Sequence, residues 1–112
     1  MRELAARIPE AISIVLFGSE ARGEAAAGSD TDLLIVVPEG GEAVEEQVRE
    51  VCLELADKQS LALSWQVVSL AEVRKWEEAG NEFWRNVRRD GIRLYGKTPE
   101  GLRQLWRRGE VT

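Results

Sequence analysis

The sequence predicts an α/β or α+β fold in which helices flank a small mixed β-sheet. Three apolar runs rich in β-branched residues, at residues 12–17, 32–37 and 62–69, have the length and composition of buried strands. Segments with apolar residues at helical spacing separate and follow these runs. Because strands that alternate with helices pack as layers, a sheet covered by helices is expected. With 112 residues and no internal repeat, the chain is expected to form one domain over residues 1–112.

Helices are predicted before, between and after the first two strands. A short helix is expected over residues 3–11 and a second over residues 19–26, where Ser19 is a favourable N-cap. After residues 38–41, a long acidic helix is indicated by apolar residues at helical spacing, namely Val44, Val48, Val51, Cys52 and Leu55. Cys52 is therefore expected in the core as a small apolar residue.

The second half of the chain carries its own helix signals. Ser69 and Glu72 form a capping-box pattern, which predicts a helix that begins at Ser69. Three further elements are expected downstream: a helix at residues 81–89, a short strand at 91–95 and a last helix capped by Thr98.

Charged residues and tryptophans leave two interpretations of the surface open. Acids concentrate at residues 39–57 and bases at residues 85–108. In one interpretation, both segments are solvated helix faces. In the other, the basic segment forms a face that contacts an acidic partner or an RNA-like acceptor. Trp76 and Trp106 lie amid charged residues and are expected to be interface anchors of an oligomer or of a partner complex.

The composition excludes several classes of function. The chain has no histidine, which excludes a self-contained Ser–His or Cys–His hydrolase, and its single cysteine excludes an internal disulfide. A net charge of −5 argues against a general nucleic-acid binder, so nucleic acid is considered only as an acceptor. No apolar run approaches the ~20 residues of a membrane helix, and no secretory core is found. The default expectation is a cytoplasmic protein without membrane contact.

A glycine–serine turn follows the first predicted strand and suggests a phosphate site. Gly18 lacks a Cβ, so the backbone can bend and approach a ligand closely. If Ser19 caps a helix, the helix N-terminus favours phosphate, and the Ser19 hydroxyl and the Arg22 guanidinium can add contacts. The segment matches neither the P-loop nor the dinucleotide glycine pattern. Because a Gly-Ser pair after a strand is common, this turn alone is weak support for phosphate binding.

Two aspartates precede the second predicted strand. Asp30 and Asp32 are two residues apart, so their carboxylates project from the same face of an extended chain. Two acids at this spacing repel each other unless a cation lies between them, and Mg²⁺ prefers carboxylates together with phosphate oxygens and water. The glycine–serine turn and the two aspartates together predict a site for a nucleoside triphosphate (NTP) with one or two Mg²⁺ ions. The plainer alternative is an ordinary turn, with Asp32 as a solvated residue at the start of a strand.

The order and spacing of these residues resemble those of the minimal nucleotidyltransferases of the DNA-polymerase-β-like superfamily. The matching positions are Gly18, Ser19, Ala21, Arg22, Gly23, Ser29, Asp30, Asp32 and Leu33. The resemblance extends to the segments at residues 63–68 and 86–96, and so covers most of the chain. It implies a polymerase-β-like nucleotidyltransferase fold.

The resemblance also implies roles and partners. It implies Mg²⁺ ligands at Asp30 and Asp32 and triphosphate contacts at Gly18, Ser19 and Arg22. Such proteins often pair with a helical HEPN-type protein, sometimes as the antitoxin that modifies a toxin by nucleotide transfer. A HEPN-type partner, a homo-oligomer, or both are therefore expected.

One position departs from the family pattern. The family usually carries a third carboxylate on the strand after the long helix, and the matching residue here is Gln66. Its side-chain oxygen can ligate Mg²⁺, but it is uncharged and cannot accept a proton at neutral pH. Asp57 and Glu72 flank this strand and are the alternative acids. Two hypotheses follow. The first is a Mg²⁺-dependent nucleotidyltransferase with Asp30, Asp32 and Gln66 at its catalytic centre; the second is a catalytically weak nucleotide- or partner-binding subunit.

Overall fold

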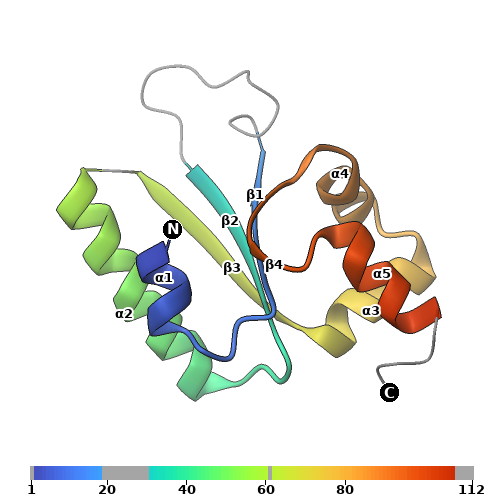
Figure 1. Cartoon of the computed structure of the whole chain (residues 1–112), viewed down its shortest axis with the longest axis horizontal. Helices are drawn as coiled ribbons and strands as arrows, with labels where there is room; N and C mark the ends of the chain where they lie inside the picture. The colour runs from blue at the N-terminus through green and yellow to red at the C-terminus, as the bar shows by residue number, and fades with distance from the viewer. Residues whose placement is uncertain (1, 19–30, 61, 108–112) are drawn as a thin grey trace.

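A four-stranded sheet with helices on both faces organises the part of the chain that the structure describes (Figure 1). The structure is a computed structural model, and it describes residues 2–18, 31–60 and 62–107. The elements follow one another in the order α1 (Arg2–Arg7), β1 (Ser13–Phe17), β2 (Thr31–Val37), α2 (Glu42–Gln59), β3 (Leu63–Ser69), α3 (Leu70–Ala79), α4 (Glu82–Asp90), β4 (Ile92–Gly96) and α5 (Pro99–Arg107). The predicted class, a small mixed sheet flanked by helices, is confirmed.

The sheet has the strand order β3-β2-β1-β4 and contains both parallel and antiparallel pairs. β1 runs antiparallel to both β2 and β4, whereas β2 and β3 run parallel. A parallel pair needs a crossover connection, and α2 supplies it between β2 and β3. β1 and β2 are therefore the central strands, and the end of β1 lies beside the start of β2.

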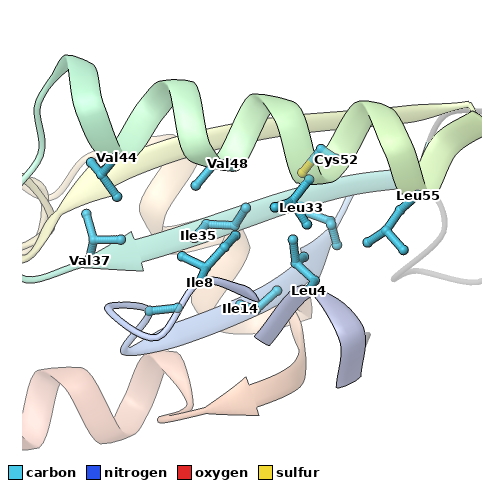
Figure 2. Close-up of a cluster of buried hydrophobic side chains, with 12 residues drawn as sticks. Leu4, Ile8, Ile14, Leu33, Ile35, Val37, Val44, Val48, Cys52 and Leu55 are labelled. Carbon is cyan, nitrogen blue, oxygen red and sulfur yellow. The ribbon is translucent and has the colours of Figure 1, made fainter. Parts of the chain in front are cut away.

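The apolar run of β2 is continuous because both faces of the strand are buried. Leu33 and Ile35 belong to a core that α1 and α2 cover, and Figure 2 shows the side chains of this first core. Leu34 and Val36 belong to a second core on the opposite face, which includes side chains of α3, α4 and α5. The two faces of the sheet consequently have separate hydrophobic cores.

Cys52 lies in the first core, as its helical spacing predicts. Its side chain is completely buried between α2 and the sheet (Figure 2). Burial raises the pKa of the Cys52 thiol to about 11, because the thiolate would lose its hydration. The thiol is therefore a packing group and not a nucleophile at neutral pH.

Most helix and strand boundaries agree with the prediction, but the first helix is shorter. α1 ends at Arg7 rather than at residue 11. Pro9 explains the difference, because it has no backbone N–H and disfavours a helical conformation at the residue before it. The helix predicted at residues 19–26 lies outside the described residues. Within the described ranges, none of the helices combines the length and the hydropathy that a membrane span requires.

Capping side chains determine where the helices of the second half begin. Ser69 and Glu72 form the predicted capping box at the start of α3, where the Glu72 backbone N–H donates to Ser69 Oγ over 3.2 Å. Asn81 Oδ1 accepts the backbone N–H of Trp84 over 2.9 Å at the start of α4. Thr98 caps α5 in the same way, as predicted. Each cap satisfies a backbone donor that the helix itself leaves unpaired.

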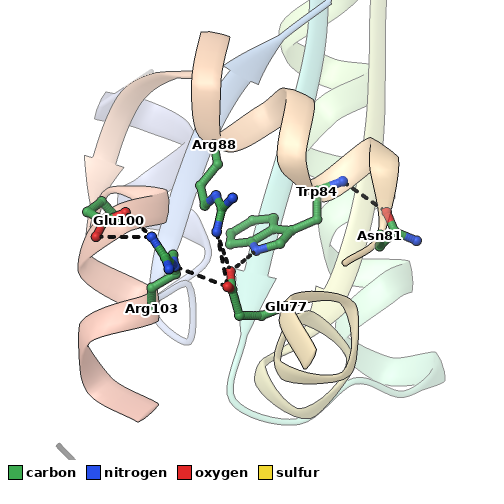
Figure 3. Close-up of polar contacts among 6 residues, drawn as sticks. All are labelled: Glu77, Asn81, Trp84, Arg88, Glu100 and Arg103. Carbon is green, nitrogen blue, oxygen red and sulfur yellow. Dashed lines mark hydrogen bonds and ion pairs between the residues drawn. The ribbon is translucent and has the colours of Figure 1, made fainter. Parts of the chain in front are cut away.

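Glu77 of α3 joins the three helices on the second face of the sheet (Figure 3). Its carboxylate accepts hydrogen bonds from Trp84 Nε1 at 2.8 Å and from Arg88 at 2.9 and 3.0 Å, both on α4. Arg103 of α5 donates to the same carboxylate at 3.0 Å. Burial acts to raise the pKa of Glu77, but the hydrogen bond from Trp84 and the two guanidinium groups together outweigh it and lower the pKa.

The tryptophans of this face belong to the second core. Trp84 is buried, and the half-buried Trp76 packs against it with ring centroids 6.5 Å apart. Trp76 also meets Phe83 edge to face at 5.6 Å. Trp76 is therefore part of the core and not the exposed anchor that its charged sequence neighbours suggest. Trp106 lies in α5, but its side chain is outside the described residues.

Replacing Glu77 by glutamine is expected to loosen the packing of α3, α4 and α5. The variant loses the charge that both arginines face, which we expect to lower the free energy of unfolding by about 1–2 kcal/mol. Because folding lowers the pKa of Glu77, its stabilising contribution is present above its usual pKa near 4.5 and is lost as the pH falls through the folded pKa. Urea unfolding of both proteins at neutral pH and at about pH 3 measures the difference.

The matched control is Glu78→Gln, which removes an exposed ion pair between Glu78 and Arg74. Exposed pairs contribute little, so this variant should lose less stability than Glu77→Gln. Equal losses in the two variants, or a Glu77→Gln effect that persists unchanged in acid, would contradict the role given to Glu77.

Candidate functional site

Asp32 lies at the end of the sheet, directly across from the last residue of β1. It stands opposite Phe17 in the antiparallel ladder between β1 and β2, and Gly18 follows Phe17 immediately. The structure thus brings together two of the predicted site residues, the glycine of the turn and the second aspartate.

The backbone at Gly18 approaches the Asp32 carboxylate so closely that no side chain fits between them. Gly18 has a φ of +80°, a conformation that residues with a Cβ rarely adopt. A Cβ at this position would overlap Asp32 Oδ2 and lie 3.3 Å from Asp32 Cγ. Glycine is therefore required for two independent reasons, its backbone conformation and the space that the carboxylate occupies.

Gln66 lies on the same face of the sheet as Asp32, on the neighbouring strand. β2 and β3 pair in parallel, with Asp32 opposite Ser64 and Leu34 opposite Gln66. Side chains two residues apart share a face, so Asp32 and Gln66 both lie on the side of the second core, where Leu34 points. Gln66 is exposed, and it is the diagonal neighbour of Asp32, whereas Ser64 is the direct one.

The other predicted site residues lie outside the described residues: Ser19, Arg22 and Asp30. Their positions relative to Asp32 stay predictions. Within the described ranges, no group of three or more His, Cys, Asp or Glu side chains converges as a metal site would. The alternative acids do not join Asp32, because Glu72 is engaged in the cap of α3 and Asp57 is exposed on α2, which covers the opposite face.

The oxygen atoms on this face suit a divalent cation such as Mg²⁺. Asp32 supplies a carboxylate whose Oδ2 occupies the space that a Cβ at residue 18 would need. Gln66 supplies a neutral oxygen on the same face. Mg²⁺ prefers oxygen ligands and is commonly bound through one or two carboxylates together with substrate phosphates. The donor set therefore fits Mg²⁺, with Gln66 as a weaker ligand than an acid.

A cavity of about 160 Å³ adjoins Gly18 on the side of α4. Its lining residues come from the end of β1, from the turn after it and from α4: Phe17, Gly18, Phe83, Asn86, Val87 and Asp90. Phe17 and Phe83 meet edge to face with ring centroids 5.2 Å apart. The cavity thus combines aromatic walls with the amide of Asn86 and the carboxylate of Asp90.

The α4 residues of this cavity were missed by the sequence analysis. Phe83, Asn86 and Asp90 recur at intervals of three and four, which is the spacing of residues on one helix face. This periodicity could have shown that the three residues lie together. It contains no information about the β-strand against which that helix face packs, so the position beside Gly18 could not follow from it.

Asp90 is held by its neighbour Arg89. Arg89 Nε and Nη2 donate to the two carboxylate oxygens over 3.1 and 2.9 Å. This hydrogen bonding, together with the negative charge of Asp90, raises the pKa of Arg89 above its usual value. A carboxylate paired with a guanidinium therefore stands at the cavity beside Gly18.

An open, arginine-rich hollow of about 610 Å³ lies along α4. Its lining consists of Gly80, Glu82, Arg85, Asn86, Arg88 and Arg89. Asn86 also lines the cavity beside Gly18, so the two spaces adjoin. Arg88 is bound to Glu77, whereas Arg85 is exposed. Arg89 is bound to Asp90, and Glu82 adds a carboxylate to the lining, so the exposed Arg85 is the group of this hollow that can attract an anion.

Comparison with known families gives a match over most of the chain. A family model described as a nucleotidyltransferase domain matches residues 1–93. No curated protein sequence matches the chain.

Three solved structures show the similarity of fold. A chain in the crystal structure of a toxin–antitoxin with AMP-PNP gives a TM-score of 0.62 at 19% identity, covering 97% of this chain and 85% of that one. A chain in the complex of tri-AMPylated Shewanella oneidensis HEPN toxin with MNT antitoxin gives 0.56 at 15% identity, covering 97% and 82%. Spectinomycin adenyltransferase AAD(9) from Enterococcus faecialis, with ATP and spectinomycin, gives 0.63 at 18% identity, covering 90% of this chain and 55% of that one. The expected nucleotidyltransferase fold is confirmed by these matches, which at such identities establish the fold alone.

Replacing Gly18 by alanine is expected to disturb Asp32 directly. The variant carries the cost of a positive φ, about 1 kcal/mol, and adds an overlap with the Asp32 carboxylate. Gly80→Ala is the matched control, because Gly80 also has a positive φ (+66°) but a Cβ there meets nothing within 4 Å. Chemical denaturation should show a larger loss of stability for Gly18→Ala than for Gly80→Ala.

A double-mutant cycle isolates the overlap from the backbone cost. In an Asp32→Ala background, the cost of Gly18→Ala should fall to that of Gly80→Ala, because the carboxylate is gone. If Gly18→Ala costs the same with and without the Asp32 carboxylate, the two residues are not in contact.

Proposed function

Because the chain belongs to the nucleotidyltransferase domain family, we propose that it transfers a nucleoside monophosphate from an NTP to an acceptor hydroxyl. The observation that carries the proposal is the contact between the Gly18 backbone and the Asp32 carboxylate at the end of the sheet. The bend brings a backbone without a side chain, which phosphate oxygens can approach closely, next to a carboxylate that can bind the cation that accompanies them.

Each residue of the predicted site has a role in this proposal. Asp30 and Asp32 would hold one or two Mg²⁺ ions. The Gly18 backbone and the Ser19 hydroxyl would hold triphosphate oxygens, and Arg22 would balance their charge. When bound, Mg²⁺ would supply Lewis-acid polarisation of the phosphoryl oxygens. The acceptor oxygen forms a bond to the α-phosphorus, the bond from that phosphorus to the bridging oxygen breaks, and pyrophosphate leaves. The hydroxyl proton passes to solvent water, because the neutral Gln66 amide cannot take it.

The cavity between β1 and α4 would receive the part of a substrate that lies next to the phosphates. Phe17 and Phe83 offer apolar contact, and the Asn86 amide offers both a donor and an acceptor. The exposed Arg85 in the hollow beside this cavity would attract an anionic acceptor or an acidic partner surface.

A catalytically weak nucleotide- or partner-binding subunit is the second candidate, and Gln66 favours it. Gln66 is exposed on the same face as Asp32, where the family pattern has a third carboxylate. A glutamine cannot take the proton from an attacking hydroxyl. Loss of general-base assistance costs about 10²–10⁴ in rate, so nucleotide binding would survive while turnover falls.

The proposed partner is a HEPN-type protein in the cytoplasm, with this chain as the antitoxin that modifies it. Two of the similar structures support this proposal, because both are toxin–antitoxin complexes. One contains AMP-PNP and the other a tri-AMPylated HEPN toxin, and attachment of AMP is the chemistry proposed for this site. A hydroxyl group on such a protein is therefore the proposed acceptor.

Asp32→Asn is expected to abolish nucleotide transfer. Label transfer from α-labelled ATP, CTP, GTP and UTP is measured with Mg²⁺, with and without a HEPN-type partner. Removing a charged metal ligand should lower transfer by at least ~10²-fold. Asp57→Asn is the matched control, because it removes the same charge from the opposite face and should retain activity.

The outcomes separate the two candidate functions. Transfer that survives in Asp32→Asn contradicts the proposed site. If the wild-type chain transfers no nucleotide under any condition, the binding-subunit hypothesis is favoured instead.

Gln66→Asp is expected to raise turnover, because it restores a carboxylate on the face of Asp32. The gain should reach about tenfold or more if proton removal limits the rate. Gln66→Asn is the control, because it also shortens the side chain but adds no charge. Unchanged or lower activity of a folded Gln66→Asp variant would remove Gln66 from the catalytic site.

A further inference from the structure

The two edges of the sheet differ in their protection against pairing with another strand. β4 is five residues long, carries Arg93, and its pairing with β1 is interrupted by a register shift between Ile14 and Val15. β3 is seven residues long, contains no charged residue and no proline, and pairs with β2 in unbroken register. Charges, prolines and bulges are the devices that keep edge strands from associating. β3 has none of them, and among the described strands only β2 pairs with it.

The outward-facing backbone groups of β3 belong to its odd-numbered residues. The Ala62 carbonyl accepts the Thr31 N–H over 2.7 Å, so the backbone groups of even-numbered residues face β2. Because the direction alternates along a strand, the N–H and C=O groups of Leu63, Trp65 and Val67 face the open edge. They form a regular ladder that another extended strand can complete.

A groove of about 330 Å³ lies along this edge, between α2 and the middle of β3. Its lining consists of Glu45, Arg49, Trp65, Gln66 and Val67. The three β3 residues are centred on Gln66, the middle of the strand. Leu53, one of the exposed large apolar residues, follows Arg49 by one turn and continues the same stripe of α2.

The charges of this groove are self-complementary about its centre. α2 runs antiparallel to β3, because it returns the chain from the end of β2 to the start of a parallel strand. Glu45, near the start of α2, therefore lies toward Val67, and Arg49 lies toward Trp65. A two-fold axis at Gln66 exchanges the two positions, so that Glu45 of one copy faces Arg49 of the other, which also pairs with Glu46 of its own helix over 3.4 Å.

We propose that a second copy of this chain pairs with β3 along this edge, antiparallel, with Gln66 on the two-fold axis. Trp65 then stands opposite Val67 of the second copy in a hydrogen-bonded pair, and aromatic–β-branched pairs stabilise sheets. This register uses the outward-facing groups of both strands. The two sheets of four strands become one continuous sheet of eight, with both Asp32 residues on the same face.

The pairing supplies a physical reason for glutamine at position 66. The two Gln66 side chains stand opposite each other in a non-hydrogen-bonded pair, where side chains approach most closely. Like charges in that arrangement destabilise the sheet, whereas two amides can hydrogen-bond to each other. A carboxylate at this position would therefore oppose the assembly.

Disulfide formation tests the register. In the full-length chain, Gln66→Cys would place two Cα atoms about 4.5 Å apart, within the ~4.4–6.8 Å range of disulfides. We expect an oxidised species of twice the 12.5 kDa chain mass on a non-reducing gel. Ser64→Cys is the matched control, because its two thiols would lie four residues out of register, about 13 Å apart. The native Cys52 is buried and does not compete.

Charge reversal tests the groove. Sedimentation equilibrium should show a dimer for the wild-type chain. Glu45→Arg should raise its dissociation constant roughly tenfold, because each reversed charge then faces Arg49. Adding Arg49→Glu to the same chain should restore the wild-type constant. Both side chains are exposed, and circular dichroism verifies that the variants remain folded.

Each contrary result overturns the proposal. If the wild-type chain stays monomeric at about millimolar concentration, a second copy does not pair with β3, and a strand of another protein is the remaining partner for this edge. Equal oxidation of Ser64→Cys and Gln66→Cys excludes the register, and a dimer that is indifferent to charge reversal excludes the groove. None of these readouts measures nucleotide transfer, so their failure leaves the transferase proposal untouched.

Discussion

The close approach of the Gly18 backbone to the Asp32 carboxylate is the constraint on which the candidate site depends. It occurs where β1 and β2 end side by side, with Phe17 opposite Asp32. Both strands contribute side chains to the two cores, so their ends cannot separate without disturbing close-packed side chains on each face of the sheet. Packing in the two cores therefore determines the position of the Asp32 carboxylate. With the carboxylate there, only glycine fits at residue 18.

The helices of the second face position the remaining part of the site. Glu77 binds side chains of α4 and α5, and so joins α3, α4 and α5 through one carboxylate. α4 in turn carries Phe83 and Asn86, which line the cavity beside Gly18. The ion pairs of Glu77 lie outside the cavity, but they help to hold α4, which forms one wall of it. The arrangement separates the residues that would contact a substrate from the residues that hold the helices in place.

The sequence predicted those parts of the fold that depend on local signals. The cap at Ser69 and the unbroken apolar run of β2 need only neighbouring residues, and both were predicted correctly. Trp76 was misjudged because its surroundings depend on how α3 packs against α4, which its charged neighbours do not reveal. Asn86 was missed because the docking of α4 against β1 is a tertiary property. For Gln66, strand periodicity predicted the face, but only the register shows that it is a diagonal neighbour of Asp32.

A calorimetric titration with a non-hydrolysable NTP analogue, in the presence and absence of Mg²⁺, measures whether Asp32 holds the cation of a bound nucleotide. We expect binding that requires Mg²⁺, that is lost in Asp32→Asn, and that is retained in Asp57→Asn. The titration measures nucleotide affinity at Gly18 and Asp32, and it does so whether or not the chain catalyses nucleotide transfer. Equal affinity in Asp32→Asn and the wild-type chain, or no binding at about millimolar nucleotide, would show that Gly18 and Asp32 do not form a site for a nucleotide with Mg²⁺.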